Sequence, residues 1–320
     1  MSDSGLFQQR HVGSARTATP LLVPSFSSRG FQDPIGVVKS YSPYTSRSCL
    51  ISAFDVHYGV LPSEWRDLAD FIVLDSGGYE AYASSELSSP RSWDLGKYKS
   101  VIESLGAGTT YLLVTFDYNL RENPYERQLA EASALCDKYP QYDWDFLVKP
   151  EGPSHHEVNI DAVVSRLDTL QRFAAIGFVE DELGSSIWSR AISIRRLRRR
   201  LIEQGLDIPI HIFGCLDPLR IPVYVLSGAD IFDGLEWLRS AFTEAGLVRF
   251  SSLAMNDGDI DMPDAERGTR AVLQNIRILT TLEVSLRKLL RSGNISDLDM
   301  PERSKVILRG FTSRLGDSDT

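Results

Sequence analysis

Three aspartates stand directly after short apolar runs in the sequence: Asp75, Asp117 and Asp233. Apolar runs of about four to eight residues are typical of inner strands of a parallel sheet, and α/β folds carry their chemistry where such strands end. Carboxylates gathered at one mouth raise one another's pKa, which favours a division into an acid and a base. Paired carboxylates suit substitution at a sugar C1′, where one attacks as nucleophile and the other carries the leaving-group proton.

The same acids also permit plainer interpretations. They could cap helices, or they could bind a hard metal ion such as Mg²⁺. An Asp-rich barrel mouth is also found in aldolases and phosphatases. Residue type and spacing alone leave these alternatives open.

The segment Asp75-Ser76-Gly77-Gly78-Tyr79 concentrates further site features. Its two glycines let the backbone come close to a ligand, because no Cβ stands in the way. Tyr79, together with Phe213 of the segment Phe213-Gly214, offers flat walls on which a planar base can stack. A strand that ends in a tight turn, with Asp75 as a helix cap, is the alternative.

The composition is that of an ordinary globular protein, with 42% apolar and 24% charged residues. A formal net charge of −9 argues against nucleic-acid binding by bulk electrostatics, so any such contact requires a local basic patch. One strongly basic segment, 194–200, provides candidate contacts to a phosphate backbone, namely Arg195, Arg196, Arg198 and Arg199. A solvated helix face that pairs with acids is equally compatible with this segment.

The three cysteines, Cys49, Cys136 and Cys215, lie far apart in the sequence. Because no Cys-x-x-Cys motif or Cys/His cluster occurs, we expect neither a disulfide framework nor a structural zinc, and we predict no other metal site. The sequence has no signal peptide and no apolar run of about 18 residues, which predicts a cytoplasmic protein without a membrane partner.

Eight apolar runs alternate with helix signals along the chain, and they span 48–54, 71–74, 111–116, 144–148, 173–178, 208–213, 229–232 and 247–250. Residues 21–23 form a possible extra strand. Repeated strand–helix alternation over about 200 residues favours a (β/α)₈ barrel. An open, doubly wound sheet is the alternative.

Three regions are expected around this alternation. Residues 1–20 lack apolar periodicity and are predicted to be a flexible arm. Residues 21–262 would form the barrel. Residues 263–320 would form a helical extension, with one long helix over 263–290, a shorter helix over 301–311 and a polar tail.

Four ordered segments resemble the tRNA-guanine transglycosylase superfamily: 75–79, Phe116-Asp117, Ile176-Gly177, and His211-Ile212-Phe213-Gly214 followed by 228–233. The resemblance covers roughly residues 48–250 and implies a (β/α)₈ barrel that exchanges guanine in a nucleic acid for a 7-deazaguanine. The implied partners are the free base and a tRNA or DNA. A protein of a modification or defence complex is a further candidate partner.

The resemblance also implies residue roles. Asp233 would be the nucleophile that forms a covalent ribosyl intermediate, and Asp75 would be the general acid and base. Asp117 would bind the N1–H and amino edge of guanine. Recognition of the base would be completed by the following residues: the side chain of Ser76, the backbone of Gly177, and Tyr79 and Phe213 on its two faces.

Several positions depart from the family pattern. Lys149 or Glu151 occupies the region where the tRNA enzymes carry a glutamine, and Glu80 replaces another glutamine. The segment 234–239 differs from the family's motif after the nucleophile, and the Cys₃His zinc site is missing, so no cofactor is expected. These departures place the chain closer to DNA 7-deazaguanine transglycosylases and related antiphage-operon proteins.

Two other functions remain alternatives. The first is a catalytically inactive barrel that binds a deazaguanine or a protein partner, which the acidic balance and the missing zinc site favour. The second is a base-releasing N-glycosidase, in which water replaces the incoming base.

Overall fold

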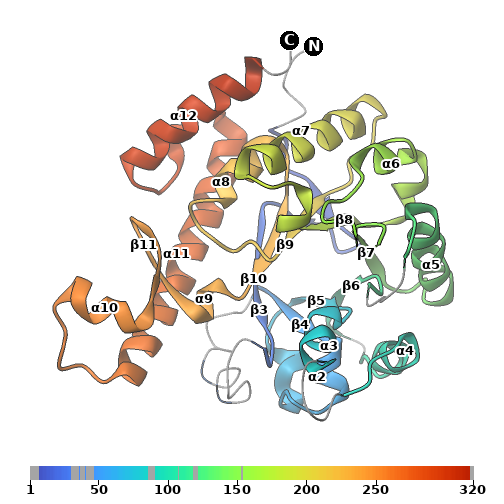
Figure 1. Cartoon of the computed structure of the whole chain (residues 1–320), viewed down its shortest axis with the longest axis horizontal. Coiled ribbons are helices and arrows are strands. Elements are labelled where there is room, and N and C mark those ends of the chain that lie inside the picture. Colours follow the sequence, from blue (N-terminus) through green and yellow to red (C-terminus); the bar gives the residue numbers. More distant parts are fainter. Residues whose placement is uncertain are drawn as a thin grey trace.

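The computed structural model describes residues 7–29, 36, 40, 47–85, 91–106, 108–117, 122–152 and 154–317. Eight parallel strands close into a barrel in the order β10-β3-β4-β5-β6-β7-β8-β9 (Figure 1). They span Leu21–Phe26 (β3), Ser48–Ser52 (β4), Phe71–Asp75 (β5), Thr110–Val114 (β6), Asp143–Val148 (β7), Ala175–Val179 (β8), Ile210–Phe213 (β9) and Ile231–Gly234 (β10). The predicted (β/α)₈ barrel is therefore confirmed.

One strand of the barrel was assigned incorrectly. Leu21–Phe26, expected only as a possible extra strand, closes the barrel between β10 and β4. The segment 247–250 instead belongs to an antiparallel hairpin of β11 (Ser240–Thr243) and β12 (Gly246–Arg249). The residues of β12 are half-buried or exposed, whereas β3 is buried along most of its length, so burial rather than local sequence distinguishes the two.

Helices surround the barrel, and the elements after β10 extend to one side of it (Figure 1). They are α2 (Ala53–His57), α3 (Gly78–Ser85), α4 (Leu95–Glu103), α5 (Tyr125–Lys138), α6 (Ile160–Val164), α7 (Ile187–Glu203), α8 (Ile221–Ser227), α9 (Glu236–Arg239), α10 (Phe250–Asp257), α11 (Asp264–Ser292) and α12 (Glu302–Asp317). Short 3₁₀ helices are η3 (Ser63–Asp67), η4 (Leu167–Arg172), η5 (Glu180–Leu183) and η6 (Ile295–Asp297). None of the helices in the described ranges is long and apolar enough to cross a membrane.

Most helix boundaries follow the sequence signals. Asp94 caps α4 by accepting a hydrogen bond from the backbone of Lys97, and α8 ends at Gly228, whose φ of 109° suits a glycine. The long helix expected over 263–290 is α11. The chain between β7 and β8 forms two short helices, α6 and η4.

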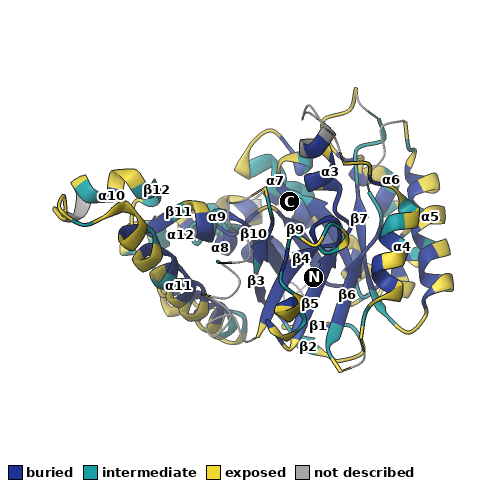
Figure 2. Ribbon diagram, turned by 90° about the horizontal axis from the view of Figure 1, so that it is seen from below, coloured by how far each residue is buried: buried dark blue, intermediate teal, exposed yellow. Residues whose placement is uncertain are grey.

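The prediction of a flexible arm over residues 1–20 is wrong for the described residues 7–20. Strands β1 (His11–Val12) and β2 (Thr17–Ala18) form a hairpin, and Val12 is fully buried with the inward-pointing residues of the barrel strands. The backbone N–H of Ser14 donates to Asp143 at the start of β7 over 2.7 Å. The hairpin therefore closes the amino end of the barrel, opposite α3 (Figure 2).

Helix α11 lies against the barrel and joins the extension to it. The side chain of Glu283 accepts a hydrogen bond from the backbone of Leu22 in β3 over 3.2 Å. The fully buried Asn275 bonds the backbone of Trp237, Ser240 and Phe242. These contacts fix β11 and α9 beside the carboxyl end of β10.

Candidate functional site

A cavity of about 570 Å³ opens at the carboxyl ends of the barrel strands. Asp75, Asp117 and Asp233 all line it, so the structure brings together the three aspartates that the sequence indicated. Its volume lies within the usual range for small-molecule sites. Its lining also includes aromatic residues (Tyr79, Tyr82 and Phe213), further acids (Glu80, Glu180, Asp181, Glu182 and Glu236) and two cations (Lys149 and Arg239).

Asp233 stands near the end of β10 and is held by two donors. Ser25 Oγ of β3 donates to Oδ2 over 2.8 Å, and the backbone N–H of Gly214 donates to Oδ1 over 3.2 Å. Gly214 has a φ of 72°, a conformation that favours glycine, and this turn points its N–H at the carboxylate. These contacts stabilise a negative charge on a side chain that still reaches the cavity.

Asp75 is in the opposite electrostatic situation. Its Oδ2 accepts one hydrogen bond, from the backbone of Gly77 over 3.0 Å. Burial raises the pKa of Asp75 well above its ordinary value, and the neighbouring carboxylates of Asp117, Glu80 and Asp233 raise it further. Asp75 therefore keeps its proton to a higher pH than an ordinary aspartate does, which suits a group that must donate a proton.

The segment after Asp75 shapes the place of Asp117. The hydroxyl of Ser76 donates to Oδ1 of Asp117, and Ser76 itself is fully buried. A Cβ on Gly78 would lie 2.6 Å from the same oxygen, and one on Gly77, whose φ is 86°, would lie 2.8 Å from Cβ of Phe54. Ser76, Gly77 and Gly78 therefore position Asp117 and the turn, but they do not line the cavity.

Tyr79 lines the cavity near its rim and is 43% exposed. The guanidinium of Arg29 lies 4.0 Å from the centre of its ring, and Arg239 donates to its hydroxyl over 3.3 Å. Within the described part of the chain neither arginine forms an ion pair. Two guanidinium groups thus stand at the mouth of an acidic cavity without a carboxylate partner among the described residues.

A buried charged pair below the cavity had no predicted role. Nδ1 of His211 in β9 lies 2.6 Å from Oδ2 of Asp145 in β7, and Nε2 lies 3.3 Å from Oδ1 of Asp233. Both Asp145 and His211 are fully buried. The sequence contains one signal for this pair, a charged residue inside an apolar run, as in Trp144-Asp145-Phe146. Because a buried charge requires a partner, such a residue indicates a buried ion pair.

Gly177 was expected to offer its backbone to the base, and the structure contradicts this. Gly177 is buried and does not line the cavity, because the ring of Phe213 lies beside it: a Cβ on Gly177 would lie 2.3 Å from Cε2 of Phe213. Phe213 also stacks on His211 with ring centres 3.8 Å apart. Gly177 therefore makes room for Phe213, and Phe213 meets the cavity.

Two glutamates complete the acidic lining. Glu80 accepts hydrogen bonds from the hydroxyls of Ser27 and Ser52, and burial followed by repulsion from Asp55 raises its pKa to about 7. Burial likewise raises the pKa of Glu236 to about 7. Both groups titrate near neutral pH, at positions where the sequence analysis assigned no catalytic role.

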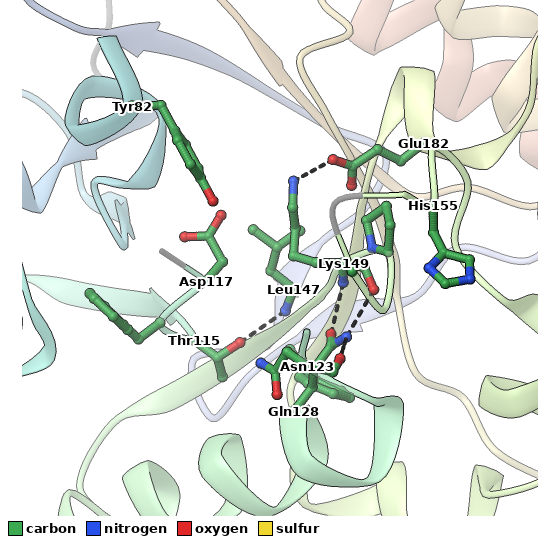
Figure 3. A pocket seen from close by; sticks show the side chains of 13 residues that line it. Tyr82, Thr115, Asp117, Asn123, Gln128, Leu147, Lys149, His155 and Glu182 are labelled. Atoms are coloured by element: carbon green, nitrogen blue, oxygen red, sulfur yellow. Dashed lines mark hydrogen bonds and ion pairs between the residues drawn. The ribbon is translucent and has the colours of Figure 1, made fainter. Parts of the chain in front are cut away.

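Lys149 lines both this cavity and a second one of about 390 Å³, whose lining is drawn in Figure 3. Its Nζ pairs with Glu182 over 2.5 Å, and Gln128 bonds its backbone N–H and C=O. In Figure 3 the hydroxyl of Tyr82 points toward Asp117 on the other side of this cavity. Lys149 thus lines the cavity, and the carboxylate of Glu182 neutralises its charge.

The basic segment does not form the predicted nucleic-acid surface. Arg198 is fully buried in α7, where it donates to the backbone of Gly228 and Ile208 and pairs with Asp230. Arg195 is also buried, and the exposed Arg196 pairs with Asp161. Arg199 is half-buried. The prediction fails because Arg195 and Arg198 are buried, and the guanidinium of Arg198 neutralises a buried aspartate and donates hydrogen bonds to buried carbonyl groups.

No group of three or more His, Cys, Asp or Glu side chains among the described residues is arranged to hold a metal ion. The three cysteines are buried thiols, and burial raises the pKa of Cys215 well above its ordinary value. The absence of a cofactor stays a prediction.

Comparisons with known proteins add no identification: no protein-family model matches this chain, and no curated protein sequence matches it significantly. Function must therefore be argued from the site itself.

Proposed function

We propose that the protein is a base-exchange glycosyltransferase that replaces a guanine in a nucleic acid with a 7-deazaguanine. The observation that carries this proposal is the meeting of Asp75, Asp117 and Asp233 in one cavity with aromatic walls. The motif resemblance to the tRNA-guanine transglycosylase superfamily supports the same reaction.

The two carboxyl groups suit the two roles that the reaction requires. Asp233, held by Ser25 and Gly214, has the environment of an ionised nucleophile. Its carboxylate attacks C1′ from the face opposite the base. Asp75, whose pKa is raised by burial and by neighbouring carboxylates, supplies a proton to the departing guanine. The incoming base then attacks C1′, Asp75 takes up its N–H proton, and the two inversions give net retention.

Base recognition is assigned to the groups beside this pair. Asp117 offers a carboxylate to the N1–H and amino edge of guanine, which donate hydrogen bonds. Phe213 offers a ring face, and Tyr79 lines the cavity near its rim. A nucleotide of a duplex must be flipped out to reach a site at the end of a barrel.

The phosphate contacts are assigned to Arg29 and Arg239 at the mouth rather than to α7. Both are exposed, and both hold Tyr79 at the cavity rim. Guanidinium groups without an acidic partner are suited to binding phosphate oxygens.

The decisive experiment is incorporation of labelled guanine into tRNA and, separately, into single- and double-stranded DNA. Incorporation by the wild type that disappears in Asp233→Asn supports the proposal, and the preferred nucleic acid names the substrate. Incorporation that persists in Asp233→Asn removes Asp233 from the nucleophilic role.

Two other outcomes lead to different functions. Release of guanine without an added base indicates an N-glycosidase. Calorimetric binding of a free 7-deazaguanine without exchange or release indicates a binding module.

A further inference from the structure

The proposed reaction gives no role to two members of a buried charged trio, Asp145 and His211, which lie beside the third member, Asp233. The imidazole bridges the two carboxylates, with Nδ1 2.6 Å from Oδ2 of Asp145 and Nε2 3.3 Å from Oδ1 of Asp233. The latter contact is an ion pair rather than an aligned hydrogen bond. Of the three, only Asp233 lines the cavity, so the trio connects the barrel interior to the reacting carboxylate.

The two carboxyl groups beside the imidazole favour its doubly protonated form. Both oxygens of Asp233 have hydrogen-bond donors, the hydroxyl of Ser25 and the backbone N–H of Gly214, which is the environment of a carboxylate. The nitrogen that faces it must therefore carry a proton, because a lone pair at 3.3 Å would repel the carboxylate. The carboxylate of Asp145 makes the same demand of Nδ1.

Electrostatics agree with this proton count. Burial by itself lowers the pKa of His211, but the charges and contacts of Asp145 and Asp233 raise it to about 9. The charged groups that face the imidazole are Asp145 from β7 and Asp233 from β10, and the uncharged ring of Phe213 covers one face. A fully buried cation thus lies against the proposed nucleophile throughout the neutral range.

The barrel leaves space for this arrangement at one glycine. Gly177 of β8 pairs with both Leu147 of β7 and His211 of β9 in the sheet register. A Cβ at Gly177 would lie 3.0 Å from the second carboxylate oxygen of Asp145. That oxygen is buried and without a hydrogen bond, so the imidazole is the contact that balances this buried charge.

We propose that His211 is a positioning residue that makes Asp233 a good leaving group, and that Asp145 keeps His211 charged. This inference rests on the proposed function. In the first step a lone pair of Asp233 forms the C1′–O bond, the C1′–N9 bond breaks, and guanine leaves with the proton of Asp75. In the second step the incoming base forms its bond to C1′ and passes its proton to Asp75, and the electron pair of the C1′–O bond returns to Asp233.

A cation beside Asp233 stabilises the free carboxylate more than the neutral ester. It therefore lowers the barrier to the return of the electron pair, and it raises the barrier to the initial attack. Removing the cation makes the ester form more readily than it is consumed. The covalent intermediate should then accumulate.

The test measures how much of the full-length protein is present as the covalent intermediate during the reaction. With the preferred nucleic acid and a saturating free base, the fraction of protein that runs as a covalent adduct on a denaturing gel is compared among the wild type, His211→Gln and Asp145→Asn. We expect a several-fold larger adduct fraction in both variants, together with slower exchange. His11→Gln at the amino end of the barrel is the matched control, and its adduct fraction should equal that of the wild type.

A second readout does not depend on activity. In ¹⁵N-histidine-labelled protein, the His211 signal is identified among five histidines by its loss in His211→Gln. We expect an imidazolium at pH 7.5 in the wild type and a neutral ring in Asp145→Asn. If either single variant unfolds, the double variant Asp145→Asn/His211→Gln, which removes the buried cation together with its deeper partner, is used for the adduct measurement.

The possible results separate the two proposals. A neutral His211 in the wild type at pH 7.5 overturns the role of His211, and so does an adduct fraction that does not rise in the variants. A wild-type protein that forms no adduct and exchanges no base overturns the proposed function, and the role of His211 falls with it.

Discussion

The two ends of the same barrel are built from different chemistry. At the amino end, Val12 of the β1–β2 hairpin packs with inward-pointing apolar residues of the barrel strands, including Leu21, Phe71, Leu112 and Ala175. At the carboxyl end, the barrel strands present Ser25, Ser52, Asp75 and Asp233, and His211 lies beneath Asp233. Alternate residues of each strand point inward, so one strand contributes to both ends.

This contrast separates stability from chemistry along the barrel axis. Apolar layers stabilise the fold through burial, whereas like-charged carboxyl groups held together in a cavity oppose it. A charge cluster of this kind is typical of a functional site, where stability is given up for reactivity. Substitutions of carboxyl groups at the carboxyl end should therefore lower the reaction rate, whereas substitutions in the apolar layers should lower the stability.

The largest effect is expected at Asp233. Asp233→Asn should lower the rate of base exchange by at least about 10³-fold, because the nucleophile is lost. The control is Asp143→Asn at the amino end, which accepts two hydrogen bonds from Ser14. Asp143→Asn should leave the rate unchanged, and a comparable loss of rate in both variants would contradict the division between the two ends.

The next effect concerns the apolar layers. Leu112 is fully buried in the barrel interior. Leu112→Ala should lower the free energy of unfolding by about 2–5 kcal/mol, measured by denaturant titration, because it leaves a cavity. The exchange rate per folded molecule should stay within about two-fold of the wild type, as the substitution touches no cavity group. An unchanged stability would show that the interior is not tightly packed at this layer.

A smaller effect is the pH dependence of stability that Glu80 causes. Its pKa is about 7 in the folded protein, above the ordinary 4.5, so the folded state holds a proton that the unfolded state releases between these values. Stability should therefore decrease as pH rises from 4.5 to 7, by up to about 1.4 kcal/mol per pH unit from this one group. Glu80→Gln should flatten the decrease, which thermal melts at several pH values would reveal. The same slope in both proteins would assign it to other groups.

His211 should also make the stability depend on pH, but at higher pH than Glu80 does. Its folded pKa of about 9 exceeds the ordinary 6.5. The stabilisation from the charged trio is therefore complete below pH 6.5 and is lost as pH rises through 9. The difference in stability between the wild type and His211→Gln should shrink over this range, and a difference that is constant with pH would contradict a charged imidazole.

The smallest effect is expected at the rim. The double variant Arg29→Gln/Arg239→Gln should weaken nucleic-acid binding several-fold and reduce the slope of log affinity against log salt by about one to two. Arg196→Gln on α7 is the matched control, since Arg196 is exposed but paired with Asp161. A stronger loss of binding in the control would restore α7 as the nucleic-acid surface.

Much of the fold could be predicted because the signals are local. Apolar runs bounded by glycine and acids indicate buried parallel strands, and a capping aspartate or a terminal glycine marks a helix end, as at Asp94 and Gly228. The positions of Asp75, Asp117 and Asp233 followed from the same logic, because parallel strands in a barrel must end at one mouth.

The remaining features could not be predicted because they depend on which surface a side chain meets. A run of arginines on a helix looks the same whether it faces solvent or, like Arg198, a buried aspartate. A short apolar segment near the amino terminus looks no more like a barrel strand than one near residue 248, although β3 closes the barrel and β12 does not.

The sequence by itself determined the class of fold and the acids that end its strands, since both follow from periodicity and from the chain direction that parallel strands share. Only the tertiary structure decided that Asp145 and His211 stand beneath Asp233, and that Gly177 leaves them room. Asp145 and His211 are 66 positions apart along the chain, and His211 and Asp233 are 22 positions apart. Their contact depends on strand register, which closure of the barrel sets and which no local pattern records.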